Sequence, residues 1–481
     1  MDGPVSVDEA LNKSIGTIGR WQFRISVLMS LLKFPIAWFQ LGIVFLAPPT
    51  NFWCRRPPEY INTTVNEWLR MITPNYTESY NQTSRYGSCY MFDLSSANTV
   101  EQSKVPCLWG YEYDTSQFRS SIITEWNLVC GRERLVDLAQ ATVMFGILLG
   151  TIMLGIASDR IGRKPVLMIC LAVQAFAGVL TAFAPTYWLL LLARFVTAFA
   201  NAGTMVASFV ICMEVVGGKW RTIIPILYQI PFGIGNSVMA GIAYWIRDWR
   251  ELQLILSLLS ALYLIYWRCV PESPRWLLAT GRREAATEIL LQAAAENKKP
   301  TNVVKSMMES LPSTTDDSTE QQKPNPSALF RTPTILTALC YMGILAVPVD
   351  VFVGDWPRIA LAGLGVVGMS VSIPALYLFT GELFPTVLRN AGLGATVMCS
   401  RIGSMFAPFI ISLSTVAPWL PLLVLGSLVF LEAILVLPLP ETKDTSLPDT
   451  VGDAEAFIGK RIEDDRKNGN YVIVGINEQR H

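Results

Sequence analysis

The chain has 481 residues, of which 51% are hydrophobic and only 16% are charged. This composition excludes an ordinary soluble protein of this size and predicts a membrane protein. Lysine plus arginine equals aspartate plus glutamate at 38 each, which argues against nucleic acid as a partner.

The N-terminus, residues 1–24, is polar and contains no cleavable signal peptide. Cations precede the first apolar run, so we expect this end to be cytoplasmic. The first span is expected at residues 25–47 and contains Lys33, whose charge inside an apolar run favours a functional role. The alternative is that Lys33 snorkels to the cytoplasmic interface.

Residues 48–136 form a long polar loop that is predicted to be extracellular and glycosylated. Four cysteines in a loop on the oxidising side predict two disulfides, and three pairings remain open. The glycosylation sites are Asn62, Asn75 and Asn81, and the cysteines are Cys54, Cys89, Cys107 and Cys130.

A charged turn, residues 155–165, separates the apolar runs 138–157 and 166–184. Its cations place it on the cytoplasmic side. We interpret it as a latch between helices that must break and reform, with an ordinary positive-inside loop as the alternative. Glycines here are expected to let neighbouring backbones approach closely. The latch residues are Gly155, Asp159, Arg160, Gly162, Arg163 and Lys164.

Apolar runs at residues 188–213, 222–245 and 252–270 complete a six-helix half, residues 25–270. Arg194 and Glu214 flank the fourth span, and either charge could lie at the interface. Arg194 is the better functional candidate, because its flanks are apolar. The fifth span is interrupted by Pro225, Pro231 and Gly233, which gives weight to Gln229 and Asn236 as polar contacts in a cavity.

Residues 271–334 are predicted to be a cytoplasmic linker between two halves. Two amphipathic helices are expected in it, at residues 283–297 and 302–311.

Several motifs together resemble the organic ion transporter family of the major facilitator superfamily. They are the large first loop and the segments 155–165, 271–278, 381–390 and 439–442. The resemblance implies a major facilitator fold of twelve spans, with the substrate site between two halves near mid-membrane. It implies that small organic cations, anions or zwitterions are moved by alternating access. We count Arg194, Glu214, Glu382 and Arg389 with the latch as gate residues.

The second half is shorter than the resemblance implies. Only four apolar runs follow Thr334, at residues 335–349, 358–380, 391–412 and 419–439. The charged turn has no second copy, so the seventh and eighth helices of the family are missing at about Pro333. We therefore expect an all-α membrane protein with about ten transmembrane helices (6 + 4). Its C-terminal half, residues 335–439, is incomplete, and residues 440–481 form a cytoplasmic tail. The alternative to a transporter is a transport-inactive truncated variant that regulates, or competes with, full-length transporters.

Arg401 lies within the apolar run 391–412. A guanidinium can hold a carboxylate by two parallel hydrogen bonds. The resemblance points the same way, because family members for organic anions and zwitterions carry arginine at the matching position. Arg401 therefore favours a carboxylate-bearing substrate, although a structural pair with Glu382 or Glu432 is the alternative.

Aromatic side chains on the spans suit flat organic substrates, although ordinary helix packing explains each ring alone. Together with the polar candidates, the predicted substrate contacts are Arg401, Lys33, Gln229, Tyr228, Phe232 and Tyr377.

No cofactor, metal or enzymatic activity is expected. Residues 363–368 match a dinucleotide fingerprint but lie in an apolar run with no strand before them. The single histidine is His481, and there is no P-loop or nucleophile elbow. The expected partners are a small organic ion and the lipid bilayer of the plasma membrane, with both termini cytoplasmic. The substrate, the coupled or exchanged ion and the oligomeric state remain open.

Overall fold

The computed structural model describes residues 13–72, 89–92, 104–218, 220–310, 357, 360–361, 363–365, 389–417 and 419–436. The chain divides into two compact units, Met1–Asp317 and Ser318–His481. The boundary between the units falls within the predicted linker, and each unit is described by itself.

The first span is built from three consecutive helices, α2 (Arg20–Leu31), α3 (Lys33–Leu41) and α4 (Ile43–Leu46). Single residues, Leu32 and Gly42, separate them. The helical segment therefore begins five residues before the predicted residue 25.

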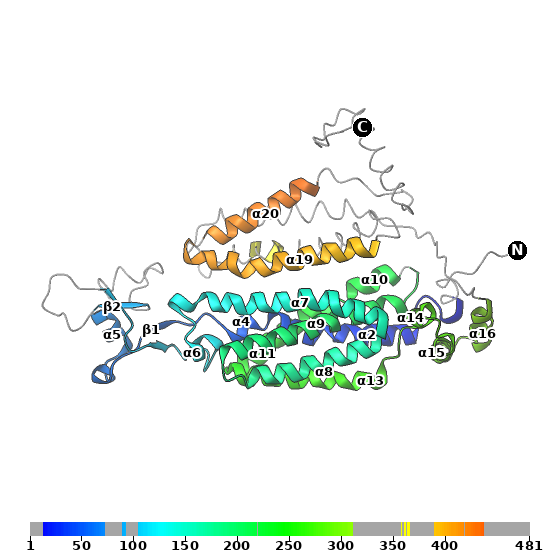
Figure 1. Ribbon diagram of the computed structural model, residues 1–481, viewed down its shortest axis with the longest axis horizontal. Coiled ribbons are helices and arrows are strands. Elements are labelled where there is room, and N and C mark those ends of the chain that lie inside the picture. Colours follow the sequence, from blue (N-terminus) through cyan, green and yellow to red (C-terminus); the bar gives the residue numbers. More distant parts are fainter. Residues whose placement is uncertain are drawn as a thin grey trace, which may run out of the picture. The chain divides into compact units, whose positions relative to one another are not determined.

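Three long helices follow the loop: α7 (Arg134–Ile161), α8 (Arg163–Ala182) and α9 (Tyr187–Val215). They run alongside one another in the first unit (Figure 1). Two glycines of α7 face the backbone of α9, and a Cβ atom at Gly150 would lie 2.4 Å from the carbonyl oxygen of Phe199. The same holds at Gly146, where the carbonyl oxygen of Phe195 would be 2.8 Å away. These glycines allow the close packing of α7 on α9.

The fifth span is broken, as its prolines predict. It consists of α10 (Trp220–Leu227) and α11 (Ile230–Trp245), with Tyr228 and Gln229 between them. The sixth span is α12 (Trp249–Ala261), the 3₁₀ turn η4 (Leu262–Ile265) and α13 (Tyr266–Cys269).

The loop contains short strands that the sequence analysis did not predict. Strand β1 (Phe52–Cys54) pairs antiparallel with β4 (Tyr111–Tyr113), and β2 (Tyr90–Phe92) pairs antiparallel with β3 (Lys104–Pro106). The helices of the loop are η1 (Pro58–Tyr60), α5 (Val65–Ile72), α6 (Ile122–Trp126) and η3 (Cys130–Arg132).

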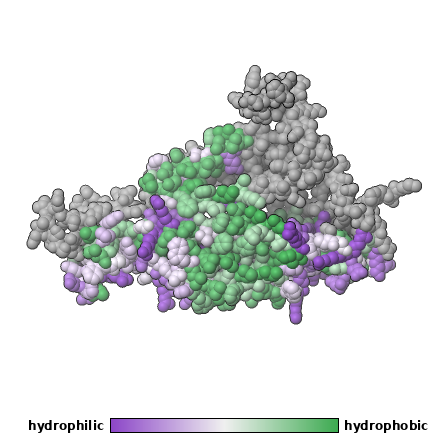
Figure 2. Space-filling model, in the orientation of Figure 1, coloured by the Kyte–Doolittle hydropathy of each residue, from purple (hydrophilic) through white to green (hydrophobic). Residues whose placement is uncertain are grey.

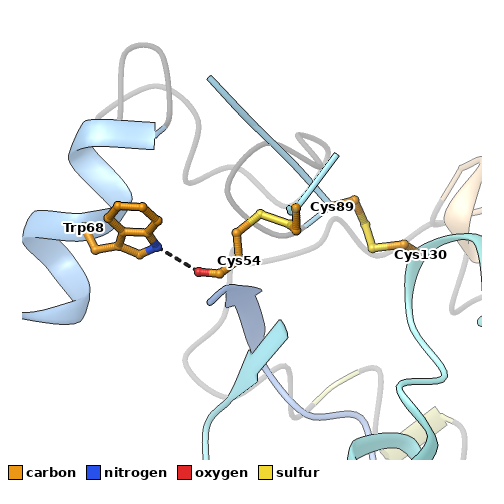
Figure 3. Close-up of a disulfide and its surroundings, with 5 residues drawn as sticks. Cys54, Trp68, Cys89 and Cys130 are labelled. Carbon is orange, nitrogen blue, oxygen red and sulfur yellow. Dashed lines mark hydrogen bonds between the residues drawn. A yellow bond between two sulfur atoms is a disulfide. The ribbon is translucent and has the colours of Figure 1, made fainter. Parts of the chain in front are cut away.

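Two disulfides, Cys54–Cys107 and Cys89–Cys130, select one of the three open pairings (Figure 3). The buried Trp68 of α5 donates from Nε1 to the carbonyl oxygen of Cys54 at 2.8 Å. Among the predicted glycosylation sites, Asn62 is exposed, and Asn75 and Asn81 lie outside the described residues.

The linker contains α14 (Pro274–Ala279), α15 (Arg283–Glu296) and α16 (Thr301–Ser310), which confirms the two predicted amphipathic helices. In Figure 1 these helices lie at one end of the long helices, and β1 and β2 lie at the other. We call these the linker end and the loop end of the first unit.

Of the second unit the structure describes α19 (Arg389–Ser412), η6 (Leu413–Thr415) and α20 (Leu420–Val436). The helices α19 and α20 match two of the predicted spans. The predicted span 335–349 lies outside the described residues, as does most of 358–380.

The outer surface of the long helices is apolar. In Figure 2 hydrophobic residues cover their middle and hydrophilic residues gather towards both ends. Among the described residues, five helical stretches are long and apolar enough to cross a membrane: Arg20–Leu41, Cys130–Ile161, Arg163–Ala182, Tyr187–Val215 and Trp249–Cys269. The broken fifth span does not meet this length criterion, because neither α10 nor α11 reaches 18 residues.

Candidate functional site

The charged turn is a one-residue joint between two helices. Helix α7 ends at Ile161 and α8 begins at Arg163, and Gly162 between them has a φ of +123°. A side chain is strained at this φ, so the joint requires glycine. The expected placement of Asp159 and Arg160 at one helix end, and of Arg163 and Lys164 at the next helix start, is confirmed.

Arg163 is the centre of a charge cluster at the linker end. Its Nη2 lies 3.1 Å from Oε1 of Glu214, and its Nε donates to Oε2 of the same carboxylate at 3.4 Å. Its Nη1 lies 2.9 Å from Oδ1 of Asp159 and also donates to the carbonyl oxygen of Ser158 at 2.8 Å. One guanidinium therefore joins α7, α8 and α9.

Glu272 of the linker caps the start of α8. Its carboxylate accepts from the backbone N–H groups of Arg163 at 3.0 Å and Lys164 at 3.2 Å. The next residue, Pro165, has no N–H to satisfy. A carboxylate at this position also complements the positive end of the helix dipole. The sequence analysis did not single out Glu272, although it lies in the segment 271–278 that carried the family resemblance.

Two further linker side chains hold the same joint. Trp276 donates from Nε1 to the carbonyl oxygen of Asp159 at 2.8 Å, and Arg275 donates from Nε to the carbonyl oxygen of Glu214 at 3.0 Å. A Cβ atom at Gly162 would lie 2.7 Å from Oε2 of Glu272 and 3.2 Å from the ring of Trp276. The glycine thus allows the linker to approach as well as the turn to form.

The other latch residues have different surroundings. Arg160 is exposed, and Lys164 places its Nζ 5.4 Å from the ring centre of Trp267. A Cβ atom at Gly155 would meet nothing within 4 Å among the described residues. The expected close backbone approach at Gly155 is not found among the described residues, whereas Gly146 and Gly150 make such an approach to α9. Glu382 lies outside the described residues, and Arg389 begins α19.

Lys33 is buried inside the first unit. Only 4% of it is exposed, and its Nζ lies 4.4 Å above the ring centre of Tyr228. The Tyr228 hydroxyl in turn lies 2.6 Å from Oγ of Ser208. A snorkelling ammonium would reach water, so the snorkelling alternative for Lys33 is wrong.

The remaining candidates of the fifth span separate into two groups. Phe232 packs against the core cluster that contains Tyr228, in line with the packing alternative. Gln229 is exposed at the start of α11. Asn236 keeps a buried amide oxygen without a hydrogen-bond partner in the part of the chain that is described.

Arg194 lies in α9 and is buried inside the first unit, with 5% of it exposed. Its Nε and Nη2 find no hydrogen-bond partner among the described residues. The charged residues that are fully buried in the described ranges are Lys33, Arg163 and Arg194, and no carboxylate is among them. Arg163 is paired at the linker end, whereas Arg194 keeps two buried nitrogen atoms without a partner in the described ranges.

Arg401 belongs to the second unit, where it lies in α19 with its side chain partly buried. Tyr377 is outside the described residues. No group of three or more histidine, cysteine, aspartate or glutamate side chains in the described ranges is arranged to hold a metal ion.

Comparison with known proteins identifies the family of the chain. A family model described as "Sugar (and other) transporter" matches residues 75–355. The organic cation transporter protein of Drosophila melanogaster is 30% identical over 533 aligned positions, which cover 93% of this chain and 94% of that protein. Solute carrier family 22 member 1 of Oryctolagus cuniculus is 31% identical over 94% of this chain and 95% of that protein.

The chain belongs to the organic ion transporter family of the major facilitator superfamily. A further relative of this organic ion transporter is organic anion transporter 3 of Oryctolagus cuniculus, 30% identical over 92% of each chain. Among solved structures, the inward open conformation of the xylose transporter XylE from E. coli matches with a TM-score of 0.55 at 13% identity. That match covers 91% of this chain and 99% of XylE. At this identity it supports the major facilitator fold alone.

The alignments also bear on the length of this organic ion transporter. The 533 aligned positions outnumber the 481 residues of the chain, so the alignment contains positions that this chain lacks. The transporter is a multi-pass membrane protein, and its relatives are transporters rather than enzymes.

Proposed function

We propose that this chain moves small carboxylate-bearing organic anions or zwitterions across the plasma membrane by alternating access. The observation that carries the proposal is Arg194, a buried arginine of the first unit whose Nε and Nη2 find no hydrogen-bond partner among the described residues. A buried cation is costly unless an anion or strong dipoles surround it. A substrate carboxylate would supply that anion.

Arg401 of α19 supports the same charge preference, because a guanidinium can hold a carboxylate in two parallel hydrogen bonds. The names of the relatives do not decide the charge, since organic cation and organic anion transporters match at similar identity. A cationic substrate resting on aromatic rings therefore remains the competing substrate class.

The Arg163 cluster is the proposed gate on the cytoplasmic side. The turn carries three cations, which favours the cytoplasmic face, and the disulfide-bonded loop then faces the outside. The pairs around Arg163 include the largely exposed Asp159, whose side chain is 73% accessible. Water can replace such contacts, so the cluster is able to open and close.

A second candidate function is a transport-inactive variant that regulates full-length transporters. Two observations favour it: only four apolar runs follow Thr334, and the alignments contain positions that this chain lacks. Under both functions we propose a ten-helix chain with the domain boundaries given above and both termini in the cytoplasm.

Uptake in cells that express this chain tests the proposal. One labelled aromatic carboxylate, one zwitterion and one quaternary ammonium cation are offered, and surface protein is labelled in parallel. We expect carboxylate uptake that falls at least about tenfold in Arg401→Asp and is unchanged in Arg461→Asp, a matched charge reversal in the tail. Surface protein that moves none of the three would overturn the transport proposal in favour of the inactive variant.

A further inference from the structure

Asn297 follows directly after α15 and reaches back to the start of the first span. Its Oδ1 accepts from the backbone N–H of Trp21 at 2.9 Å. Its Nδ2 donates to the carbonyl oxygen of Ile15 at 3.0 Å and to Oε1 of Gln22 at 2.7 Å. One amide side chain therefore makes three hydrogen bonds to residues more than 270 positions earlier in the sequence.

These bonds replace a missing helix cap. Helix α2 starts after Gly19, which has no side chain to accept from the first N–H groups. Asn297 supplies that acceptor from another part of the chain, which is the role that a local serine or asparagine usually has. A Cβ atom at Gly19 would lie 2.4 Å from Oδ1 of Asn297, so glycine is needed here for the amide to approach.

The residues before α2, numbers 14–19, form a strap that the same amide holds. Ile15 and Trp21 are buried in a core cluster that also contains Ala293 and Val304 of the linker helices. The carbonyl oxygen of Thr17 accepts from the backbone N–H of Gly217, after α9, at 3.0 Å. The strap thus lies between the linker and the end of the fourth span.

Further contacts also hold the strap, including a hydrogen bond from Nε2 of Gln22 to the carbonyl oxygen of Gly16 at 3.0 Å. A small recess open to solvent lies beside it and is lined by Ile15, Gly16, Trp21, Glu214 and Arg275 among others. The ion pair between Arg24 and Glu296, 3.0 Å long, has one side chain that is 52% exposed. Exposed pairs of this kind contribute little to stability, whereas Asn297 makes three hydrogen bonds to the strap and the start of α2.

Through its hydrogen bonds, Asn297 connects the linker with the first span. The linker continues from α16 into the second unit, and α2 continues along the first span to Lys33. A movement of the second unit that pulls on the linker therefore reaches the first span at Asn297.

We propose that Asn297 is a positioning residue for transport. It ties the linker to the first span, and so sets the position of Lys33 over Tyr228 when the linker moves. This inference rests on the proposed transport function.

The first test is a double-mutant cycle on uptake. Asn297→Ala removes all three bonds, and Gly19→Ala forces the amide aside. Each should raise KM for a labelled carboxylate at least about threefold per surface molecule. The double variant should be no worse than the worse single variant, because both changes remove the same contacts. The matched control is Asn302→Ala, an exposed asparagine in α16, which should leave KM unchanged.

A purely structural role would lower the amount of surface protein and leave KM unchanged, and that result would overturn the proposal. Effects of Gly19→Ala and Asn297→Ala that multiply in KM would also overturn it, because the two residues would then act independently.

The second test does not need transport. Ser14 is 2% exposed, so Ser14→Cys gives a thiol that the docked strap protects. With Cys269, Cys340 and Cys399 changed to serine, Asn297→Ala should raise the rate of maleimide labelling at position 14 at least about tenfold, and Asn302→Ala should not. An unchanged rate would show that Asn297 does not hold the strap. A wild-type chain that moves no substrate would overturn the proposed function alone, and labelling would still report on the strap.

Discussion

The two ends of the first unit differ in their covalent cross-links, although both contain hydrogen bonds and ion pairs. At the loop end two disulfides, Cys54–Cys107 and Cys89–Cys130, fix the loop, and the second one connects it to the residues just before α7. At the linker end the described contacts are hydrogen bonds and ion pairs, centred on Arg163 and Asn297.

This difference matters because the two kinds of bond respond differently to movement. A disulfide opens only by chemical exchange, whereas a hydrogen bond or an ion pair can exchange its partner for water within the time of a conformational change. The loop end is therefore suited to keep one shape, and the linker end is suited to alternate between two. Four predictions test this contrast, in order of the expected size of the effect.

The largest effect is expected from removing a disulfide at the loop end. Cys89→Ser together with Cys130→Ser opens a loop with a sequence separation of 41 residues. The loss of stability should be about 4 kcal/mol by the chain-entropy argument. We expect the variant to be retained inside the cell, and surface labelling measures this. Normal surface delivery would show that the loop end does not depend on this covalent bond.

The next largest effect is expected at the centre of the linker end. Arg163→Ala leaves the carboxylate of Glu214, 17% exposed, without its cation. This should lower the free energy of unfolding by about 2–4 kcal/mol. The loss is smaller than for breaking a fully buried ion pair, because Asp159, the other partner of Arg163, is exposed. Thermal unfolding of the purified protein measures the loss. The control Arg160→Ala, at an exposed position in the same turn, should change stability by less than about 0.5 kcal/mol.

Two glycine substitutions compare the effect on stability at the joint, Gly162, with the effect within the preceding helix α7, at Gly155. Gly162→Ala should destabilise by about 1–3 kcal/mol, because φ is +123° and the new Cβ would lie 2.7 Å from Glu272. Gly155→Ala lies inside α7 with open space around it in the described structure, so it should stabilise by about 0.5–1 kcal/mol. Effects of the same sign in unfolding experiments would contradict this account.

The smallest effect concerns Glu112 of β4 and depends on pH. Burial alone would raise the pKa of Glu112, but hydrogen bonds from Arg56 and Trp53 outweigh it and hold that pKa below its usual 4.5. The bound carboxylate therefore stabilises the fold above about pH 4.5, and this contribution is lost as pH falls through the lowered pKa. Glu112→Gln should be less stable than wild type at pH 7, and the difference should be smaller at pH 3. A difference that stays constant between these pH values would contradict this assignment.

Much of this fold could be predicted from local patterns. Apolar runs located the spans, prolines located the break at Tyr228, and helix-end charges located the latch. Long-range partners could not be predicted in this way. Glu272 meets Arg163 across 109 residues, and Asn297 meets Trp21 across 276, so no pattern within one helix reveals either contact.

The glycines illustrate the same limit. The sequence singles out Gly155 and Gly162 because both lie in a charged turn, but only Gly162 has close neighbours among the described residues. Gly146 and Gly150 matter because α7 packs closely on α9 at these positions. The distance between two helices cannot be read from the sequence. The pairing of four cysteines was open for the same reason.

The residues that cap α8 and α2, Glu272 and Asn297, lie far downstream in the sequence. This has a consequence for the way the protein is synthesised. Trp21 leaves the ribosome 276 residues before Asn297, and Arg163 leaves it 109 residues before Glu272. During synthesis both helices therefore enter the membrane with their first N–H groups uncapped, and they acquire their caps only after all six spans have been translated. The linker end is consequently the last part of the first unit to mature, and a chain stalled before residue 297 would leave α2 without its Asn297 cap.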